Sequence, residues 1–305
     1  MKVVLTLLLL LSCRPALALT IATGTPEGTY YQIAQDIKKI ADKEGIPFEI
    51  IQTNGSLDNI NLLGLEKVDL AILQLDVLKV TSDRMQTKAD FNIFEVMKVI
   101  LNLYFEEIHV LTKTESIRSI SQLEGKRVAV GPEGSGSALT AAVLLTAYDL
   151  HVERSFDTPN DALRKLEGGE LDALIFVGGA PVPAFEKLDA SFRFVRLPPN
   201  PLLEQIYQRK KINKGVYAWA GEVETFAVPS VIMTRDRKES SYVTLIQKLL
   251  LAIFANKATL EATGHPKWKS SQFGPMLPDL GYGPGQDVLS IHSILEEHGY
   301  QMMKK

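Results

Sequence analysis

The fold is decided by Val128-Ala129-Val130-Gly131-Pro132-Glu133-Gly134-Ser135-Gly136-Ser137. Residues 128–130 are typical of a short apolar strand, and residues 138–148 carry apolar side chains at helical spacing. The sequence therefore predicts a strand, a glycine-rich turn and the start of a helix. Because glycine permits close approach and the first N–H groups of a helix attract negative charge, this turn is a candidate carboxylate or phosphate site.

The same stretch excludes two familiar phosphate motifs. No Gly-Lys-Ser/Thr follows the glycines, so it is not a P-loop. Leu139 stands where the dinucleotide fingerprint needs glycine or alanine. For this stretch alone, a tight turn that binds nothing is the competing interpretation.

The chain shows the same plan twice, with an aspartate at the start of the last strand of each copy. Alternating strands and helices predict βαβαβ units with parallel sheets, so we expect an α/β protein of two similar lobes. Asp69 and Asp172 occupy the corresponding positions. The first copy has strands at 20–23, 48–52 and 68–73 and helices at 30–43 and 56–66; the second has strands at 127–130, 151–156 and 171–177 and helices at 138–148 and 159–166.

Two further strand-like segments, 96–112 and 215–234, are expected to cross between the lobes and form a hinge. Helices at 240–256 and 287–298 are expected to return to the first lobe, with an irregular loop at 267–285 between them. Two lobes joined by two strands predict a molecule that opens and closes.

Residues 1–18 have the pattern of a secretory signal peptide: Lys2, an apolar run, and Ala16-Leu17-Ala18 as the cleavage site. Lipid attachment at Cys13 is the less favoured alternative. Cleavage leaves no cysteine, and 31 basic against 36 acidic side chains give a net charge of −5. Without a basic block, nucleic-acid binding is not expected.

The sequence predicts no catalytic, cofactor or metal site. The histidines at 109, 151, 265, 292 and 298 stand in no metal-binding spacing, and no Gly-x-Ser-x-Gly motif occurs. Asp69, Asp76 and Asp172 stand at strand ends, where capping or ligand contact is expected rather than an acid–base pair. The protein is therefore expected not to be an enzyme.

Polar residues instead gather where strands are expected to end, which is where open α/β sheets bind ligands. Tyr30 faces the core on the predicted helix, so Tyr31 is the freer aromatic residue beside the ligand. Gln74 and Asp76 are expected at the polar far end, with Asp76 facing an ammonium group. The predicted ligand-binding set is Thr25, Gly28, Thr29, Tyr31, Asn54, Ser56, Gln74, Asp76, Gly134, Ser135, Gly136, Ser137, Phe176 and Gly178.

Together these motifs resemble the TAXI family, the extracytoplasmic solute receptors of tripartite ATP-independent periplasmic (TRAP) transporters. The resemblance covers nearly the whole chain after residue 18. It rests on Gly24-Thr25 to Tyr31, the segment 52–61, Val68-Asp69-Leu70-Ala71 leading to Gln74 and Asp76, the segment 123–131, and Gly134-Ser135-Gly136-Ser137.

The resemblance implies a type II periplasmic-binding-protein fold, with one lobe of residues 19–106 plus 226–305 and a second of residues 107–225. It implies a small organic anion or amino acid as ligand, such as a glutamate-like carboxylate, and a TRAP membrane permease as partner. A periplasmic sensing module for a kinase or chemoreceptor is the alternative use of the same fold.

Overall fold

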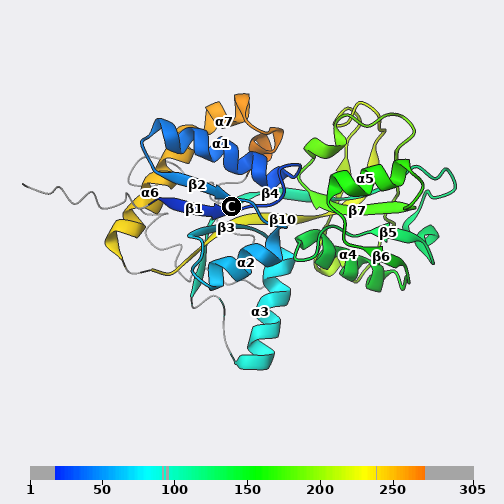
Figure 1. Ribbon diagram of the computed structural model, residues 1–305, viewed down its shortest axis with the longest axis horizontal. Coiled ribbons are helices and arrows are strands. Elements are labelled where there is room, and N and C mark those ends of the chain that lie inside the picture. The colour runs from blue at the N-terminus through cyan, green and yellow to red at the C-terminus, as the bar shows by residue number, and fades with distance from the viewer. Residues whose placement is uncertain (1–17, 91–92, 94–95, 238, 272–305) are drawn as a thin grey trace, which may run out of the picture.

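The computed structural model describes residues 18–90, 93, 96–237 and 239–271. These residues form two α/β lobes that lie side by side and are connected by two long strands (Figure 1). The strand order of the continuous sheet is β2-β1-β3-β10-β4-β7-β5-β6. The expected pair of lobes is therefore present.

The first lobe contains a parallel sheet in the order β2-β1-β3, in which Leu19 pairs with Phe48 and Ile21 with Leu70. Helix α1 lies on one face of this sheet and α2 on the other (Figure 1). The elements of the lobe are β1 (Leu19–Ala22), α1 (Thr29–Lys43), β2 (Phe48–Ile51), α2 (Ser56–Gly64), β3 (Leu70–Gln74), α3 (Leu75–Ala89), α6 (Ser240–Ala255), α7 (Lys257–Thr263) and a short 3-10 helix, η5 (Pro266–Ser270).

The second lobe repeats the arrangement, with parallel strands in the order β6-β5-β7. The duplication extends to a hydrogen bond: Asp69 accepts from the Thr20 N–H, and Asp172 accepts from the Arg127 N–H, both at 2.9 Å. The elements of this lobe are β5 (Arg127–Ala129), α4 (Gly136–Ala147), β6 (Glu153–Ser155), α5 (Pro159–Glu167), β7 (Ala173–Gly178), β8 (Arg193–Phe194) and β9 (Gln208–Ile212).

Two long antiparallel strands cross between the lobes, β4 (Met97–Thr112) and β10 (Val223–Arg235). Residues between Met97 and Glu107 of β4 pair with β10, and residues 107–111 pair with β7 of the second lobe. The expected crossing strand 96–112 is confirmed. The second expected crossing strand, 215–234, is shorter in the structure, because β10 begins only at Val223. The lobe boundaries at 106/107 and 225/226 stay predictions.

The local sequence explains why these elements form. In α1 the side chains of Ile33, Ile37 and Ile40 recur at helical spacing, and all three are buried against the sheet. Fully burying each such side chain contributes roughly 1.5–3 kcal/mol. The helix ends at Lys43, and Gly45 follows with a φ of +64°, a conformation that glycine adopts without strain.

Several elements differ from the sequence-based expectation. Helix α3 begins at Leu75, where only a strand end was expected, and its buried side chains lie within residues 75–78. The short strands β8 and β9 and the helix α7 were not expected either. The predicted helix 287–298 and nearly all of the predicted signal peptide lie outside the described residues.

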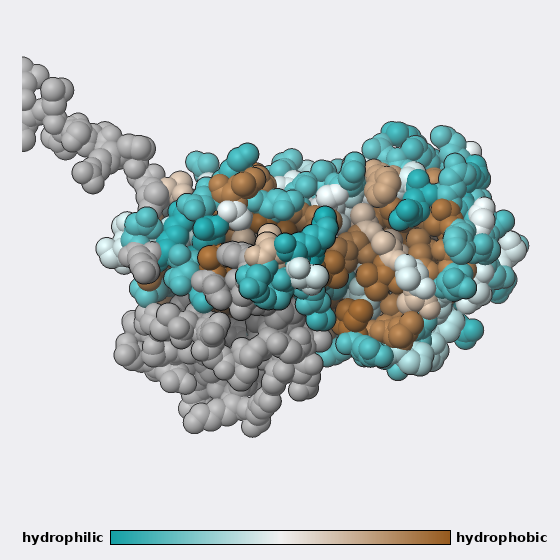
Figure 2. Space-filling model, turned by 90° about the horizontal axis from the view of Figure 1, so that it is seen from below, coloured by the Kyte–Doolittle hydropathy of each residue, from teal (hydrophilic) through white to brown (hydrophobic). Residues whose placement is uncertain are grey.

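The surface of the second lobe carries apolar side chains on the face seen from below (Figure 2). Helix α4 belongs to this lobe and is apolar on several sides, so that Val143 and Ala147 are only partly buried. In the described part of the chain, no single helix is both long and apolar enough to cross a membrane. Helices α6 and α7 reach that length only together, as a pair bent by 61°.

Candidate functional site

Three helices begin at one small cavity between the lobes. Helix α1 begins after Gly28, α2 after Gly55 and α4 after Ser135, and the residues at all three starts line the cavity. The starts of α1 and α2 have no side-chain cap, and Ser135 caps α4 by accepting from the Ala138 N–H at 3.0 Å. Because helix N-termini carry partial positive charge, their convergence favours an anion here.

Among the described residues, the cavity lining contains hydroxyl and amide side chains and one acidic residue, with no lysine, arginine or histidine. An anion would therefore be held by N–H groups, hydroxyls and amides rather than by a basic side chain. The lining residues are Gly24, Thr25, Gly28, Thr29, Tyr30, Asn54, Gly55, Ser56, Gln74, Glu106, Pro132, Ser135, Gly136, Ser137, Phe176, Val177 and Gly178.

The structure brings eleven of the fourteen predicted residues together in this lining. They come from both lobes and from segments more than 150 positions apart in the chain. The eleven are Thr25, Gly28, Thr29, Asn54, Ser56, Gln74, Ser135, Gly136, Ser137, Phe176 and Gly178. The three that lie outside it are Tyr31, Asp76 and Gly134.

The neighbour of Tyr31, Tyr30, lines the cavity in its place. The Tyr30 hydroxyl lies 3.3 Å from Ser56 Oγ, and burial raises the pKa of Tyr30 well above its usual value. From the sequence, the side chain of Tyr30 was expected to point only into the hydrophobic core. It points to the cavity because the cavity itself lies on the buried side of α1.

Asp76 lies behind the lining, where it joins the lobes. Its Oδ2 accepts hydrogen bonds from Thr140 Oγ1 at 2.6 Å and from the Tyr207 hydroxyl at 2.9 Å, both in the second lobe. Burial raises the pKa of the Asp76 carboxyl, and these hydrogen bonds partly oppose the rise. Asp76 therefore has protein partners where a ligand ammonium was expected.

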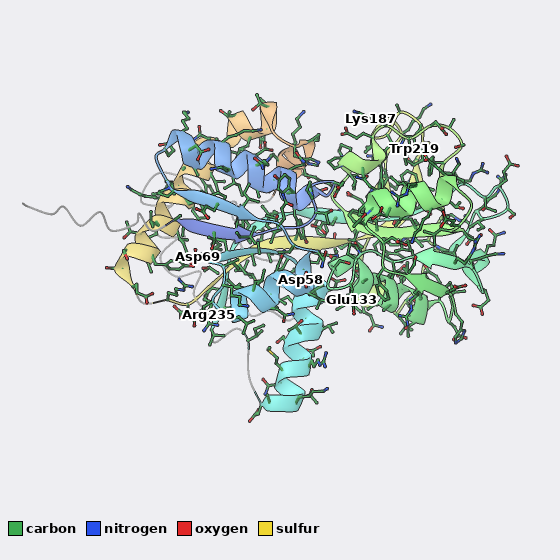
Figure 3. The ribbon with its side chains drawn as sticks, viewed as in Figure 1. Asp58, Asp69, Glu133, Lys187, Trp219 and Arg235 are labelled. Atoms are coloured by element: carbon green, nitrogen blue, oxygen red, sulfur yellow. The ribbon has the colours of Figure 1, made fainter. Side chains whose placement is uncertain are left out.

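Gly134 also contributes to contact between the lobes, because its carbonyl accepts from the Asp58 N–H at 3.1 Å. Figure 3 shows Asp58 on the first lobe beside Glu133 on the second. Asp69, in contrast, lies far from the contact between the lobes, before the start of β3 (Figure 3). There it accepts a hydrogen bond from the Thr20 N–H and forms an ion pair with Arg237 at 3.1 Å. The role of Asp69 is thus to hold strands together.

Two adjacent glutamates at the crossing point of β4 were not predicted as site residues. Glu107 forms a buried ion pair with Lys267 at 2.5 Å and accepts from the Ala180 N–H at 2.9 Å. Glu106 lines the cavity and is only 1 % exposed. Burial raises the pKa of Glu106 to about 8. The sequence feature that could have identified them is a pair of adjacent acidic residues inside a mostly apolar strand.

The lobes are closed on each other in this structure. Thr29 Oγ1 donates to the Gly179 carbonyl at 2.8 Å, and Gln74 Nε2 donates to Thr140 Oγ1 at 3.3 Å. The cavity measures about 40 Å³, whereas pockets for small ligands measure roughly 300–1,000 Å³. A ligand of amino-acid size therefore requires the lobes to separate further.

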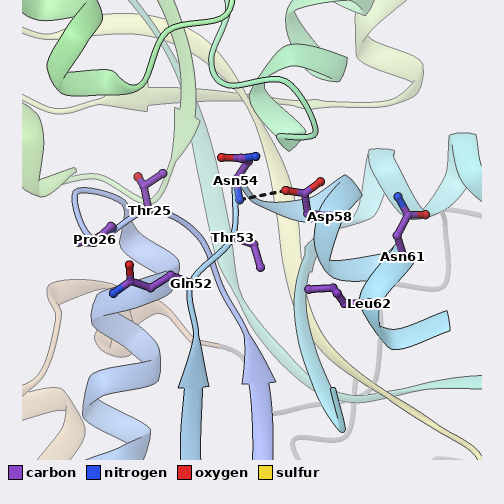
Figure 4. Close-up of a pocket in the computed structure, with 8 residues that line it drawn as sticks. All are labelled: Thr25, Pro26, Gln52, Thr53, Asn54, Asp58, Asn61 and Leu62. Atoms are coloured by element: carbon purple, nitrogen blue, oxygen red, sulfur yellow. Dashed lines mark hydrogen bonds between the residues drawn. The ribbon is translucent and has the colours of Figure 1, made fainter. Parts of the chain in front are cut away.

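A larger polar groove of about 560 Å³ lies on the first lobe beside this cavity (Figure 4). Thr25 and Asn54 line both spaces, so the groove adjoins the cavity. Asp58 accepts a hydrogen bond from the Asn54 N–H at 3.2 Å at its edge. The remaining lining residues of the groove are Pro26, Gln52, Thr53, Asn61 and Leu62.

No group of histidine, cysteine, aspartate or glutamate among the described residues is arranged to hold a metal ion. His109 is buried, contacts the Tyr217 hydroxyl at 2.9 Å, and has a pKa lowered by burial to about 3. His265 Nε2 lies 3.0 Å from the Pro181 carbonyl. Both histidines thus serve packing and the contact between the lobes.

The two lobes, the crossing strands and the cavity between them define a bilobal α/β protein. Similar solved structures are the substrate-binding protein of an amino acid ABC transporter (TM-score 0.50, 14% identity, 83% of this chain and 96% of that one) and Tv2483 bound to L-arginine (0.50, 14%, 84% and 92%). A third is XAC2383 from Xanthomonas citri bound to ATP (0.50, 13%, 92% and 97%).

At these identities the likeness shows the fold, which confirms the expected type II periplasmic-binding-protein architecture. The first of these is described as a substrate-binding protein, and the other two structures contain bound L-arginine and bound ATP. The NMT1-like family profile matches residues 21–273, so the chain belongs to the NMT1-like family. Membership of the TAXI family stays a prediction.

Proposed function

We propose that this protein is an extracytoplasmic solute-binding receptor that captures a small organic anion or amino acid between its lobes and delivers it to a TRAP-type permease. The observation that carries the proposal is the convergence of three helix starts on one interlobe cavity, to which no described residue contributes a basic side chain. The TAXI-like motifs and the signal-like residues 1–18 support the transport role and the periplasmic location.

The ligand carboxylate is held in this proposal by N–H groups of the first helical turns and by the Ser56 and Ser137 hydroxyls. Each hydrogen bond to a charged acceptor contributes roughly 1.5–3 kcal/mol. Several such bonds, reduced by the entropy cost of association, correspond to a dissociation constant on the order of 1 μM. A similar protein that binds L-arginine agrees with an amino acid as ligand.

The lobes close because the ligand contacts both of them. A ligand shifts the balance between open and closed forms only by its preference for the closed form. Helix starts α1 and α2 lie on the first lobe and α4 lies on the second, so one carboxylate contacts all three only when the lobes close around it, with slightly more space between them than in this structure. The closed form then presents a distinct surface to the permease.

The test is calorimetric titration of the chain from residue 19 onward, refolded to remove ligand carried through purification. The panel contains the common L-amino acids and small mono- and dicarboxylates. We expect at least one of them to bind with a dissociation constant of roughly 1 μM or lower. Absence of binding to every member of the panel would contradict the receptor function.

The transport role has a separate test, because binding alone does not identify the permease. Cells that lack this gene should lose uptake of the radiolabelled ligand, and a plasmid copy should restore it. Undiminished uptake in the deleted strain would leave the binding function standing and reject delivery to a permease.

A further inference from the structure

Glu106 is a buried acid with unused hydrogen-bonding capacity at the cavity. It lies on β4 where the strand crosses between the lobes, and its side chain is 1 % exposed. Among the described residues, Oε1 of Glu106 has no hydrogen-bond partner, and neither has the buried hydroxyl of Tyr104, whose pKa is raised by burial and by the Glu106 charge. Buried polar atoms are nearly always paired, so these atoms indicate a missing partner.

No described lysine, arginine or histidine forms an ion pair with Glu106. The nearest cation that acts on it, Lys267, is bound to Glu107 at 2.5 Å, and adjacent residues of a strand point to opposite faces. The other titratable side chains that interact electrostatically with Glu106 are those of Tyr30, Tyr104 and Asp76. None of these three carries a positive charge. An ionised carboxylate in such a site is costly until a cation arrives.

The cavity therefore has two ends of opposite character. The starts of α1, α2 and α4 favour a negative group, and Glu106 favours a positive one. The two ends are close together, because the Tyr30 hydroxyl contacts Ser56 at the start of α2 and also lies near enough to Glu106 to influence its pKa. A ligand that satisfies both ends carries an anion and a cation a few atoms apart, as an α-amino acid does.

We propose that Glu106 is the acceptor for the ammonium group of an amino-acid ligand whose carboxylate is held at the three helix starts. This inference rests on the proposed function and narrows its ligand class. It predicts that amino acids bind and that carboxylic acids of the same length without the amino group bind poorly. It moves the ammonium contact from Asp76, which is occupied by Thr140 and Tyr207, to Glu106.

A proton accompanies the ligand in this arrangement. Burial raises the pKa of the Glu106 carboxyl to about 8, so this carboxyl is protonated in most ligand-free molecules near neutral pH. An ammonium group within hydrogen-bond distance favours the ionised form, so the carboxyl gives its proton to solvent when the ligand binds. Binding at pH 7 then releases close to one proton per ligand.

The experiment compares pairs of probes that differ by the amino group: L-glutamate with glutarate, and L-alanine with propanoate. Calorimetry in two buffers of different ionisation enthalpy gives both the affinity and the number of protons released. We expect the amino acid of the binding pair to bind at least about 30-fold more tightly and to release close to one proton. Equal affinity within a pair would overturn the inference and leave the receptor function standing.

Variants give the second arm of the test. Glu106→Gln keeps the shape and removes the charge, so it should weaken amino-acid binding at least about 30-fold and abolish proton release. Glu106→Asp, which keeps the charge, should recover part of the affinity. Glu133→Gln removes an exposed charge near Ser135 without touching the cavity and serves as the matched control.

Two outcomes distinguish failure of the proposed role of Glu106 from failure of the proposed receptor function. Amino-acid affinity within threefold of wild type in Glu106→Gln would show that Glu106 does not face the ammonium, because its amide would then serve as well as the acid. Loss of all binding by wild-type protein to every amino acid and carboxylate would instead reject the receptor function. Circular dichroism of each variant confirms that it is folded.

Discussion

Replacing Glu106 by glutamine should change how the stability of the free protein depends on pH. Burial raises the pKa of Glu106 from its ordinary value of 4.5 to about 8. Between these two values the folded protein holds a proton that the unfolded chain has lost. The stabilisation is therefore complete below about pH 4.5 and is lost as the pH rises towards 8.

The magnitude follows from the single proton involved. While the folded state holds one more proton than the unfolded state, the free energy of unfolding falls by about 1.4 kcal/mol per pH unit. Between pH 5.5 and 7.5 Glu106 thus costs wild type about 3 kcal/mol of stability. Glutamine does not titrate, so the stability of the variant relative to wild type should rise by about 3 kcal/mol between pH 5.5 and pH 7.5.

The assay is urea unfolding at pH 5.5, 6.5 and 7.5 without ligand, with the unfolding free energy of the variant subtracted from that of wild type at each pH. The subtraction removes contributions that both proteins share, such as those of His109 and His265, whose pKa values are lowered by burial. Glu133→Gln should give a difference that stays flat. A flat difference for Glu106→Gln as well would refute a buried, protonated Glu106.

Three further substitutions test other parts of the account. Ser135→Glu places a carboxylate at the start of α4 and should abolish ligand binding in calorimetry while the far-UV spectrum is unchanged. Gly136→Ala should lower affinity at least about tenfold, because the new Cβ would lie 2.6 Å from Gln74 Cδ, closer than real Cβ contacts allow. Lys267→Met should lower the urea-unfolding free energy by about 3–5 kcal/mol, because it leaves Glu107 buried without its cation.

Each of these substitutions has a control and a contrary result. For Ser135→Glu the control is Ser135→Ala. Retained affinity in the glutamate variant would show that the ligand anion does not bind at the helix starts. For Gly136→Ala, small-angle scattering should show a more open molecule, and unchanged affinity and shape would contradict close contact of the lobes. For Lys267→Met, a second substitution, Glu107→Gln, should restore most of the stability; a loss below 1 kcal/mol in the single variant would mean that the pair is not buried.

The repeated βαβαβ plan was predictable because it depends on local signals. Glycine-rich turns at Gly131 and Gly55, both with positive φ in the structure, mark the points where strands pass into helices. The two aspartates Asp69 and Asp172 precede matching strands and make matching hydrogen bonds. Such features are encoded within a few residues of one another, so a single sequence shows them.

Helix α3 and strand β9 were not predictable from the same signals. The buried residues of α3 lie within residues 75–78, so the helix lacks a continuous apolar stripe at helical spacing. Strand β9, Gln208–Ile212, is polar and short, and it forms because β10 offers it an edge. Both elements depend on contacts made elsewhere in the fold.

Most of the candidate site could be predicted because its residues stand at strand-to-helix junctions, whereas Glu106 stands inside a strand. Whether Glu106 or Glu107 faces the cavity depends on the register of β4 as it passes from β10 to β7. The choice between Tyr30 and Tyr31 likewise depends on where the second lobe meets α1. Asp76 was expected to be free because Thr140 and Tyr207, which bind it, lie more than 60 positions away.

A crystal structure grown with the tightest-binding member of the calorimetric panel tests the central claim most directly. The account predicts that the carboxylate lies between the lobes, within hydrogen-bond distance of N–H groups in the first turns of α2 and α4, and that both lobes contact the ligand. A ligand bound to one lobe alone, or on a surface away from these helix starts, would contradict it.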